Sequence, residues 1–200
     1  MISDKFVILG ALINLAGTLA YVVHTLQGRT KPNRISWFMW TLAPFVAFAA
    51  ELGEGVGLQA LVTFMAGFNP FLILLASFVN RKSVWKLTRF DFLCGALSLL
   101  GLLLWAITRE GNIAIWFSIF ADGLAAVPTI IKSYGEPESE SWIGYFSGGF
   151  SAFIGLLTIK HWTFATYGFP VYILCVCALL TVLIKFKLGP RLEVARTGNT

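Results

Sequence analysis

The chain has 200 residues, of which 57% are hydrophobic and only 12% are charged. Soluble domains usually carry about twice that charged fraction, so the composition excludes an ordinary soluble domain. The net charge of +5 is carried mainly by residues that flank long apolar runs. That position indicates membrane topology rather than nucleic-acid binding, and we expect no nucleic-acid partner.

Apolar runs of about twenty residues, the length with which a helix crosses a bilayer, follow one another along the chain. They cover residues 6–27, 35–52, 57–79, 91–108, 112–133, 141–158 and 163–186. These runs predict an all-α polytopic membrane protein with seven transmembrane helices. Continuous apolar stretches argue against a β-barrel, whose strands alternate apolar and polar residues. The first run is also too long for a cleaved signal peptide.

Lys and Arg residues are distributed unequally between the two sides that a seven-helix topology creates. Twelve fall on one side and three on the other. Because cytoplasmic loops carry the excess of positive charge, we expect an integral protein of the plasma (inner) membrane. Its amino terminus would lie outside and its carboxyl terminus in the cytoplasm.

The sequence contains an internal repeat. Residues 12–50 match residues 117–155 without a gap, and the match includes a Pro-x3-Ser-Trp motif in the loop before the second helix of each copy. From residue 63 onward the match continues at an offset of 100. The repeat predicts a 3+1+3 plan: a first three-helix unit at 1–80, a connecting helix at 81–110, a second unit at 111–188 and a cytoplasmic tail at 189–200.

An inserted helix makes the two units parallel, which is a transporter plan with a site between the halves near the membrane midplane. The second unit reads Pro128-Thr129 near the end of its first helix, followed by Glu138-Ser139-Glu140-Ser141-Trp142. In these features the chain resembles a divergent, bacterial-type member of the SWEET and PQ-loop transporter superfamily. A Pro-Gln pair and a Ser-rich loop are typical there, and Thr129 stands where Gln is usual.

The resemblance implies alternating access of a cavity between the two units, with prolines as hinges. Pro44 and Pro128 are the candidate hinges, and static kinks packed by neighbouring helices are the alternative. The family's sugar carriers place an asparagine on the third helix of each unit, at the pocket. Asn69 matches it in the first unit, whereas its repeat mate is Phe169.

Asp122 is the strongest single candidate for a functional residue, because it lies close to the middle of run 112–133. A charge there costs about 2.5 kcal/mol or more on insertion scales. It is interpreted as a proton- or solute-binding group, or else as a brace between two helices. Asn14 shares a helix face with Gly17, the repeat mate of Asp122, and so is expected near the same cavity. His24 is a candidate for proton transfer or gating, with helix capping as the alternative.

At the expected cytoplasmic face, an acidic cluster that includes Glu138 is positioned opposite a basic loop that includes Arg34. We consider a gate formed by an Arg34–Glu138 ion pair, with a solvated charge run as the alternative. Trp37 and Trp142 begin the second helix of each unit and are interpreted as anchors at the membrane interface, as is Trp40.

We find no catalytic grouping, metal-ligand spacing or phosphate-binding glycine loop in the sequence, and we expect neither an enzyme nor a cofactor. The predicted function is a membrane transporter of a small polar solute, such as a sugar, an amino acid or a vitamin-like compound. Proton-coupled and facilitated transport both remain open, as does a homo-oligomer. The alternative function is a receptor or ligand-binding module of the same fold that does not transport. In either case the partners would be a small-molecule solute and the lipid bilayer.

Overall fold

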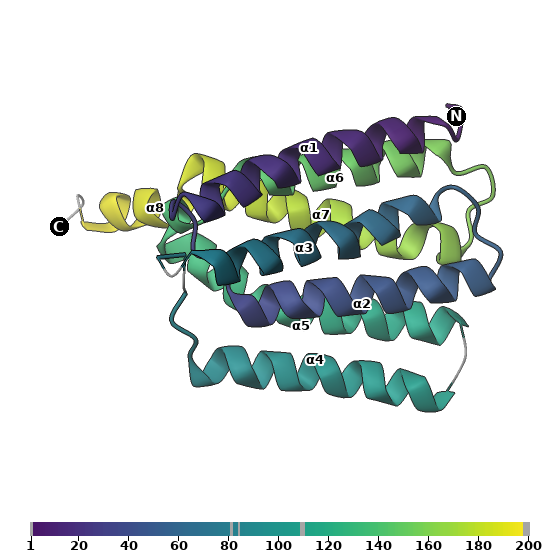
Figure 1. Ribbon diagram of the computed structural model, residues 1–200, viewed down its shortest axis with the longest axis horizontal. Helices are drawn as coiled ribbons and strands as arrows, with labels where there is room; N and C mark the ends of the chain where they lie inside the picture. The colour runs from purple at the N-terminus through teal and green to yellow at the C-terminus, as the bar shows by residue number, and fades with distance from the viewer. Residues whose placement is uncertain (1, 81, 84, 109–110, 198–200) are drawn as a thin grey trace.

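The structure is a computed structural model that describes residues 2–197 except 81, 84, 109 and 110. The described residues form helices joined by short loops (Figure 1). The helices are α1 (Phe6–Leu26), α2 (Arg34–Gly53), α3 (Ala60–Val79), α4 (Arg89–Thr108), α5 (Gly111–Gly135), the short 3-10 helix η1 (Pro137–Ser139), α6 (Trp142–Thr158), α7 (Phe164–Phe186) and α8 (Leu188–Thr197).

The all-helical prediction is confirmed for the described residues. The helices α1 to α7 correspond to the seven predicted runs, with boundaries that differ by three residues at most, where α3 begins at Ala60 rather than at 57. Among the described residues, five of these helices are long and apolar enough to cross a membrane, namely α1, α2, α3, α5 and α7. The helix α6 is apolar but has only 17 residues.

The part of the chain that the structure describes has eight α-helices, whereas the sequence predicted seven. Part of the tail predicted at 189–200 forms α8, and residues 198–200 lie outside the described residues. The backbone of Lys187 is left-handed (φ 50°), which ends α7 and redirects the chain into α8. The tail has no long apolar run, so the hydropathy pattern gave no sign of this helix.

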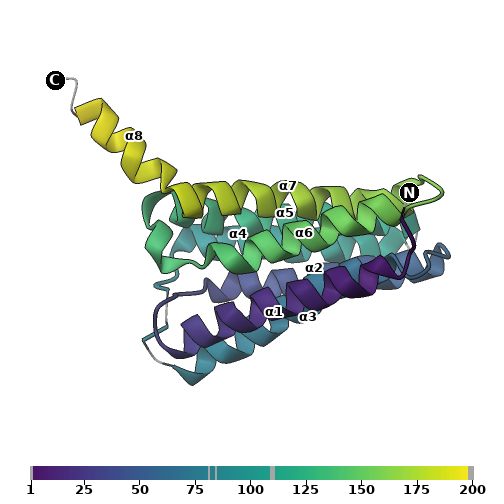
Figure 2. The same ribbon diagram turned by 90° about the horizontal axis from the view of Figure 1, so that it is seen from above.

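The helices are arranged in two layers, which Figure 2 shows edge-on. One layer contains α1, α2 and α3, and the other contains α5, α6 and α7. Within each layer the third helix contacts the other two, and across the layers α1 packs on α6 and α2 packs on α5. The helix α4 packs against α5 and α2 on the outside. In Figure 1, α1 and α5 start at the same end of the bundle and run in the same direction.

Large apolar side chains lie on the outside of the bundle and many polar side chains lie inside it, which is the reverse of a soluble protein. Large apolar side chains such as Phe92, Trp116 and Phe120 are about 60% exposed on the outside of the bundle. Polar side chains such as Thr63, Ser118 and Thr129 are completely buried. Exposed apolar surface on this scale would be a liability in water. The arrangement fits an integral membrane protein with lipid around its outer surface.

Small residues allow α1 and α6 to approach closely across the two layers. Gly17 faces Ser147, and a Cβ atom at position 17 would collide with the serine side chain. Gly10, about two turns earlier in α1, also lies close to α6, and a Cβ atom there would be 3.2 Å from Oγ of Ser151. Small residues at helix contacts are the usual basis of tight packing in membranes. The contact brings the two layers together beside the site described next.

Candidate functional site

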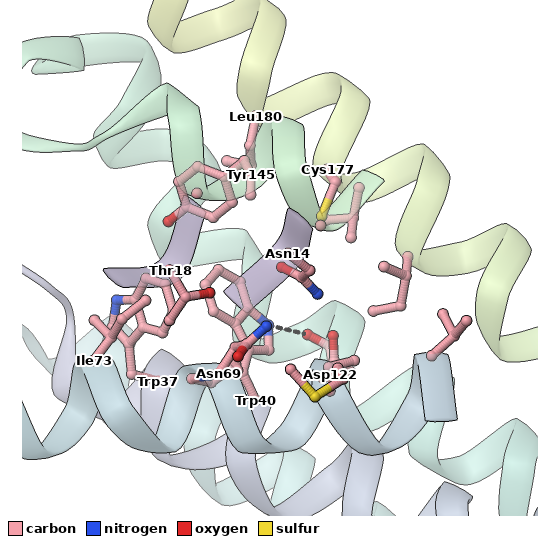
Figure 3. A pocket seen from close by; sticks show the side chains of 18 residues that line it. Asn14, Thr18, Trp37, Trp40, Asn69, Ile73, Asp122, Tyr145, Cys177 and Leu180 are labelled. Atoms are coloured by element: carbon pink, nitrogen blue, oxygen red, sulfur yellow. Dashed lines mark hydrogen bonds between the residues drawn. The ribbon is translucent and has the colours of Figure 1, made fainter. Parts of the chain in front are cut away.

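A cavity of about 80 Å³ lies between the two layers. Its lining comes from α1, α2, α3, α5, α6 and α7, and α4 contributes none of the described lining residues. Its polar and aromatic lining residues are Asn14, Thr18, Trp37, Trp40, Asn69, Asp122 and Tyr145 (Figure 3). We refer to it as the central cavity. Three of the predicted binding residues, Asn14, Asn69 and Asp122, meet there.

Asp122 is 2% exposed, and its carboxyl group has only one satisfied oxygen. The hydroxyl of Tyr172 donates a hydrogen bond to Oδ2 at 2.7 Å. Among the described residues Oδ1 has no hydrogen-bond partner. The backbone carbonyl of Asp122 accepts a hydrogen bond from the indole Nε1 of Trp40 at 3.2 Å, which links α5 to α2. Buried polar atoms are normally paired, so the free Oδ1 is available to a ligand.

The side chain of Asn69 is also left without partners. It is 4% exposed, and neither its Oδ1 nor its Nδ2 is hydrogen-bonded to a described residue. Figure 3 shows Asn14, Asn69 and Asp122 directed toward one another from α1, α3 and α5. A carboxyl oxygen and an amide that both lack partners in one cavity form a site that can offer acceptors and donors to a small polar molecule.

The interpretation of Trp37 and Trp40 as interface anchors is wrong. Both indoles are buried, at 4% and 7% exposure, and both line the central cavity. Their rings are 5.1 Å apart, edge to face, and each is about 6 Å from the ring of Tyr145. Their position near the start of α2 suggested the interface, but the rotation of α2 directs them inward. Trp142, which begins α6, is only partly buried and lies under the Nζ of Lys185, 4.4 Å from its ring centroid.

A buried polar cluster closes the bundle at the end where α1 and α5 finish. We call its four residues, Tyr21, Lys132, Glu140 and Tyr145, the polar latch. One carboxylate oxygen of Glu140 accepts from Lys132 Nζ at 2.5 Å, and the other accepts from the hydroxyls of Tyr21 and Tyr145. The side chains of Lys132 and Glu140 are no more than 1% exposed.

The polar latch joins the two layers. Lys132 also donates to the backbone carbonyl of Lys31 at 2.5 Å, so α5 is tied to the α1–α2 loop. The amide of Lys31 in turn donates to the carbonyl of Ser139, 2.9 Å away at the end of η1. The Nζ of Lys132 lies 4.8 Å from the ring centroid of Trp85. These contacts satisfy a buried charge pair that would otherwise be costly.

The expected Arg34–Glu138 pair does not form. Arg34 donates to the Ser77 carbonyl at 2.6 Å and lies over the Phe78 ring, so it holds α2 to α3 within one layer. Glu138 pairs instead with Lys187 at 2.6 Å, and both side chains are more than half exposed. The hydrogen bond and the positive charge of Lys187 lower the pKa of the Glu138 carboxyl. The sequence indicated opposite charges in facing loops. The acid that is buried is Glu140 rather than Glu138, and its partner is Lys132 of α5.

The remaining predicted site residues lie apart from the central cavity. His24 is partly buried in the last turn of α1 and does not line the cavity. Pro44 and Pro128 are buried inside α2 and α5, and neither lines the cavity. Pro70, next to Asn69, does line it. The structure thus brings together the binding candidates other than His24, while the hinge function of the prolines stays a prediction.

Sequence reasoning overlooked Glu51 as a buried acid. Its side chain is 1% exposed near the end of α2, and Oε1 accepts a hydrogen bond from Thr63 Oγ1 at 2.8 Å. Glu51 does not line the central cavity. Its place near a run boundary made it resemble an ordinary helix-end charge. Within the described ranges, no group of three or more His, Cys, Asp or Glu side chains could hold a metal ion.

No protein-family model, curated protein or solved structure matches the chain. The central cavity and the polar latch are therefore the features that bear on function.

Proposed function

We propose that this protein is a membrane transporter of a small polar solute that works by alternating access. The observation that carries the proposal is the central cavity, which is lined by helices of both layers. It contains polar atoms that have no hydrogen-bond partner among the described residues, namely Oδ1 of Asp122 and the side-chain amide of Asn69. A buried carboxyl group inside a membrane bundle is costly and is usually retained for a function. Here the carboxyl oxygen is left free toward the space that a solute would occupy.

The contacts between the layers differ in chemistry at the two ends of the bundle, and this difference supports movement of the layers. At one end the polar latch ties the layers through hydrogen bonds and a charge pair. Toward the other end an apolar cluster that includes Val56, Ile115 and Phe169 joins α2, α3, α5 and α7. Hydrogen-bonded contacts can exchange for water as they open, and an apolar contact has no directional bonds to break.

Tyr145 connects the latch to the solute site, since it lines the cavity and also donates to Glu140. A solute that displaces the Tyr145 ring would disturb the hydrogen bond to Glu140. Binding and opening would then be linked through one side chain, as alternating access requires. Proton coupling through Asp122 is part of the proposal to be tested by the pH dependence of uptake.

The proposal includes the 3+1+3 plan of the SWEET and PQ-loop superfamily. In this plan 1–80 and 111–188 are the two three-helix units, and 81–110 contains the connecting helix. It is supported by the matching packing of the third helix in each layer and by the outer position of α4. The amino terminus would lie outside and the carboxyl terminus in the cytoplasm, so that the polar latch closes the cytoplasmic end.

The test is uptake by purified protein in liposomes, with a panel of labelled sugars, amino acids, vitamins and amines. We expect wild type to move at least one of them, and Asp122→Asn to abolish that movement. Glu51→Gln is the matched control, because it also replaces a buried acid by its amide but outside the cavity. A protein that binds a solute tightly and never releases it on the far side is a receptor, and that result would overturn the transport proposal.

A further inference from the structure

The charge balance of the central cavity indicates the class of its ligand. Asp122 is the one acid among the 18 residues that line the cavity, and those residues include no Lys, Arg or His. The titratable side chains near its carboxyl group are Tyr172, which donates to Oδ2, and Cys177, which also lines the cavity. Neither supplies a positive charge. A carboxylate in this position has no positively charged partner among the lining residues, and a cationic ligand could supply one.

We infer that the solute of the central cavity is a small organic cation, an amine or ammonium compound whose positive charge pairs with Asp122. This inference rests on the proposed function, since it names the class of solute that the same site would carry. The free Oδ1 of Asp122 is the anionic partner, and the unpaired amide of Asn69 offers an acceptor and a donor beside it. A buried charge is stabilised when it is both paired and hydrogen-bonded.

The aromatic lining favours an organic cation over a metal ion. The indoles of Trp37 and Trp40 and the ring of Tyr145 pack within about 6 Å of one another at the cavity wall. Such rings attract ammonium groups through their π faces. Hard metal ions prefer around six oxygen ligands, whereas the remaining wall is largely apolar, with Ile73, Val176 and Leu180.

The volume of the cavity limits the size of the solute. A cavity of about 80 Å³ has room for two or three water molecules, each of which takes ~30 Å³ in the liquid. An amine of a few heavy atoms, such as ethanolamine, is in this range. Choline is larger and requires the two layers to move apart, and a disaccharide is far too large. The neutral alcohol 3,3-dimethylbutan-1-ol has the shape of choline without its charge, and so it isolates the contribution of charge.

The experiment measures binding first, in lipid nanodiscs, through the change in tryptophan fluorescence caused by indoles in the cavity wall. The probes are ethanolamine, choline, 3,3-dimethylbutan-1-ol, acetate and sodium chloride. We expect saturable binding of an ammonium compound and much weaker binding of the neutral alcohol. Asp122→Asn should weaken ammonium binding by about thirtyfold or more, as expected for one half of a buried charge pair. The control Glu51→Gln should bind as wild type does.

The inference is overturned if the neutral alcohol binds as well as choline, or if only sodium or acetate changes the signal. That comparison uses wild type alone, so it holds even where Asp122→Asn fails to fold. Uptake of the same probes into liposomes then separates the two proposals. Ammonium-selective binding without flux would support an organic cation as the ligand and contradict transport. Flux of a sugar or an anion, without ammonium binding, would support transport and contradict the cation.

Discussion

The hydroxyl of Tyr145 lies 3.0 Å from the carboxylate of Glu140, while the ring of the same tyrosine lines the cavity that contains Asp122. One side chain thus belongs both to the polar latch and to the proposed solute site. In the proposed mechanism this shared residue links the latch to the cavity.

Tyr145→Phe should loosen the polar latch while leaving the aromatic wall of the cavity in place. The hydroxyl donates to a charged acceptor, a contact worth about 1.5–3 kcal/mol, so the free energy of unfolding in detergent should fall by about that amount. Tyr134→Phe is the control, because Tyr134 is 38% exposed near the end of α5. If both variants have the same free energy of unfolding, the hydrogen bond from Tyr145 to Glu140 does not stabilise the fold.

Glu140→Gln should be strongly destabilising, because it leaves the buried ammonium of Lys132 without its counter-charge. Removing one partner of a buried pair costs about 3–5 kcal/mol. The double variant with Lys132→Met should recover part of that loss, since it removes the stranded charge. Denaturant unfolding of the two single variants and the double variant measures this coupling. Strictly additive effects would show that the pair does not act as a unit.

Glu138 provides the exposed counterpart of the same experiment. Lys187 lowers the pKa of its carboxyl group, so the pair stabilises the fold above the usual Glu range and loses that effect as pH falls through the lowered pKa. Carboxyl NMR of protein with labelled Glu should find Glu138 titrating below the usual range. Lys187→Met should return it to that range. Because both side chains are exposed, Glu138→Gln should lower stability only slightly at neutral pH.

Gly17→Ala tests the contact between the two layers. A methyl group there would collide with Ser147 on α6, and overpacking of this kind costs about 1–3 kcal/mol. Adding Ser147→Gly should relieve the collision with the serine side chain and recover part of the lost stability. The matched control is Gly53→Ala, where no heavy atom lies within 4 Å of the added Cβ. Equal unfolding of the two single alanine variants would contradict close packing of α1 on α6.

Much of the fold could be predicted from the sequence because membrane helices need continuous apolar runs, and those runs are local. The boundaries of α1 and α7 follow directly from them. The same reasoning placed Asp122 near a helix centre, and the face shared by Asn14 and Gly17 directed Asn14 to the same cavity. These predictions needed only the apolar runs, the periodicity of a helix and the internal repeat that pairs Gly17 with Asp122.

The errors concern contacts between distant parts of the chain. Hydropathy does not specify how α2 rotates, so the inward direction of Trp37 and Trp40 was missed. The choice of Glu140 over Glu138 depends on which acid the loop buries against Lys132, and position in the sequence does not decide it. A lysine inside the run 112–133 was the available signal, because a charge there needs a partner.

The most direct test of alternating access is the accessibility of the cavity from the two sides of the membrane. Thr18 lines the cavity, and Thr18→Cys in a chain whose native cysteines are replaced by alanine gives it one reactive thiol. Ser3→Cys and Arg191→Cys, near the two chain ends, serve as one-sided controls. Alternating access predicts that a membrane-impermeant thiol reagent labels Thr18→Cys from either side, and each control from one side only. Labelling of Thr18→Cys from a single side under all conditions, with or without solute, would contradict the account.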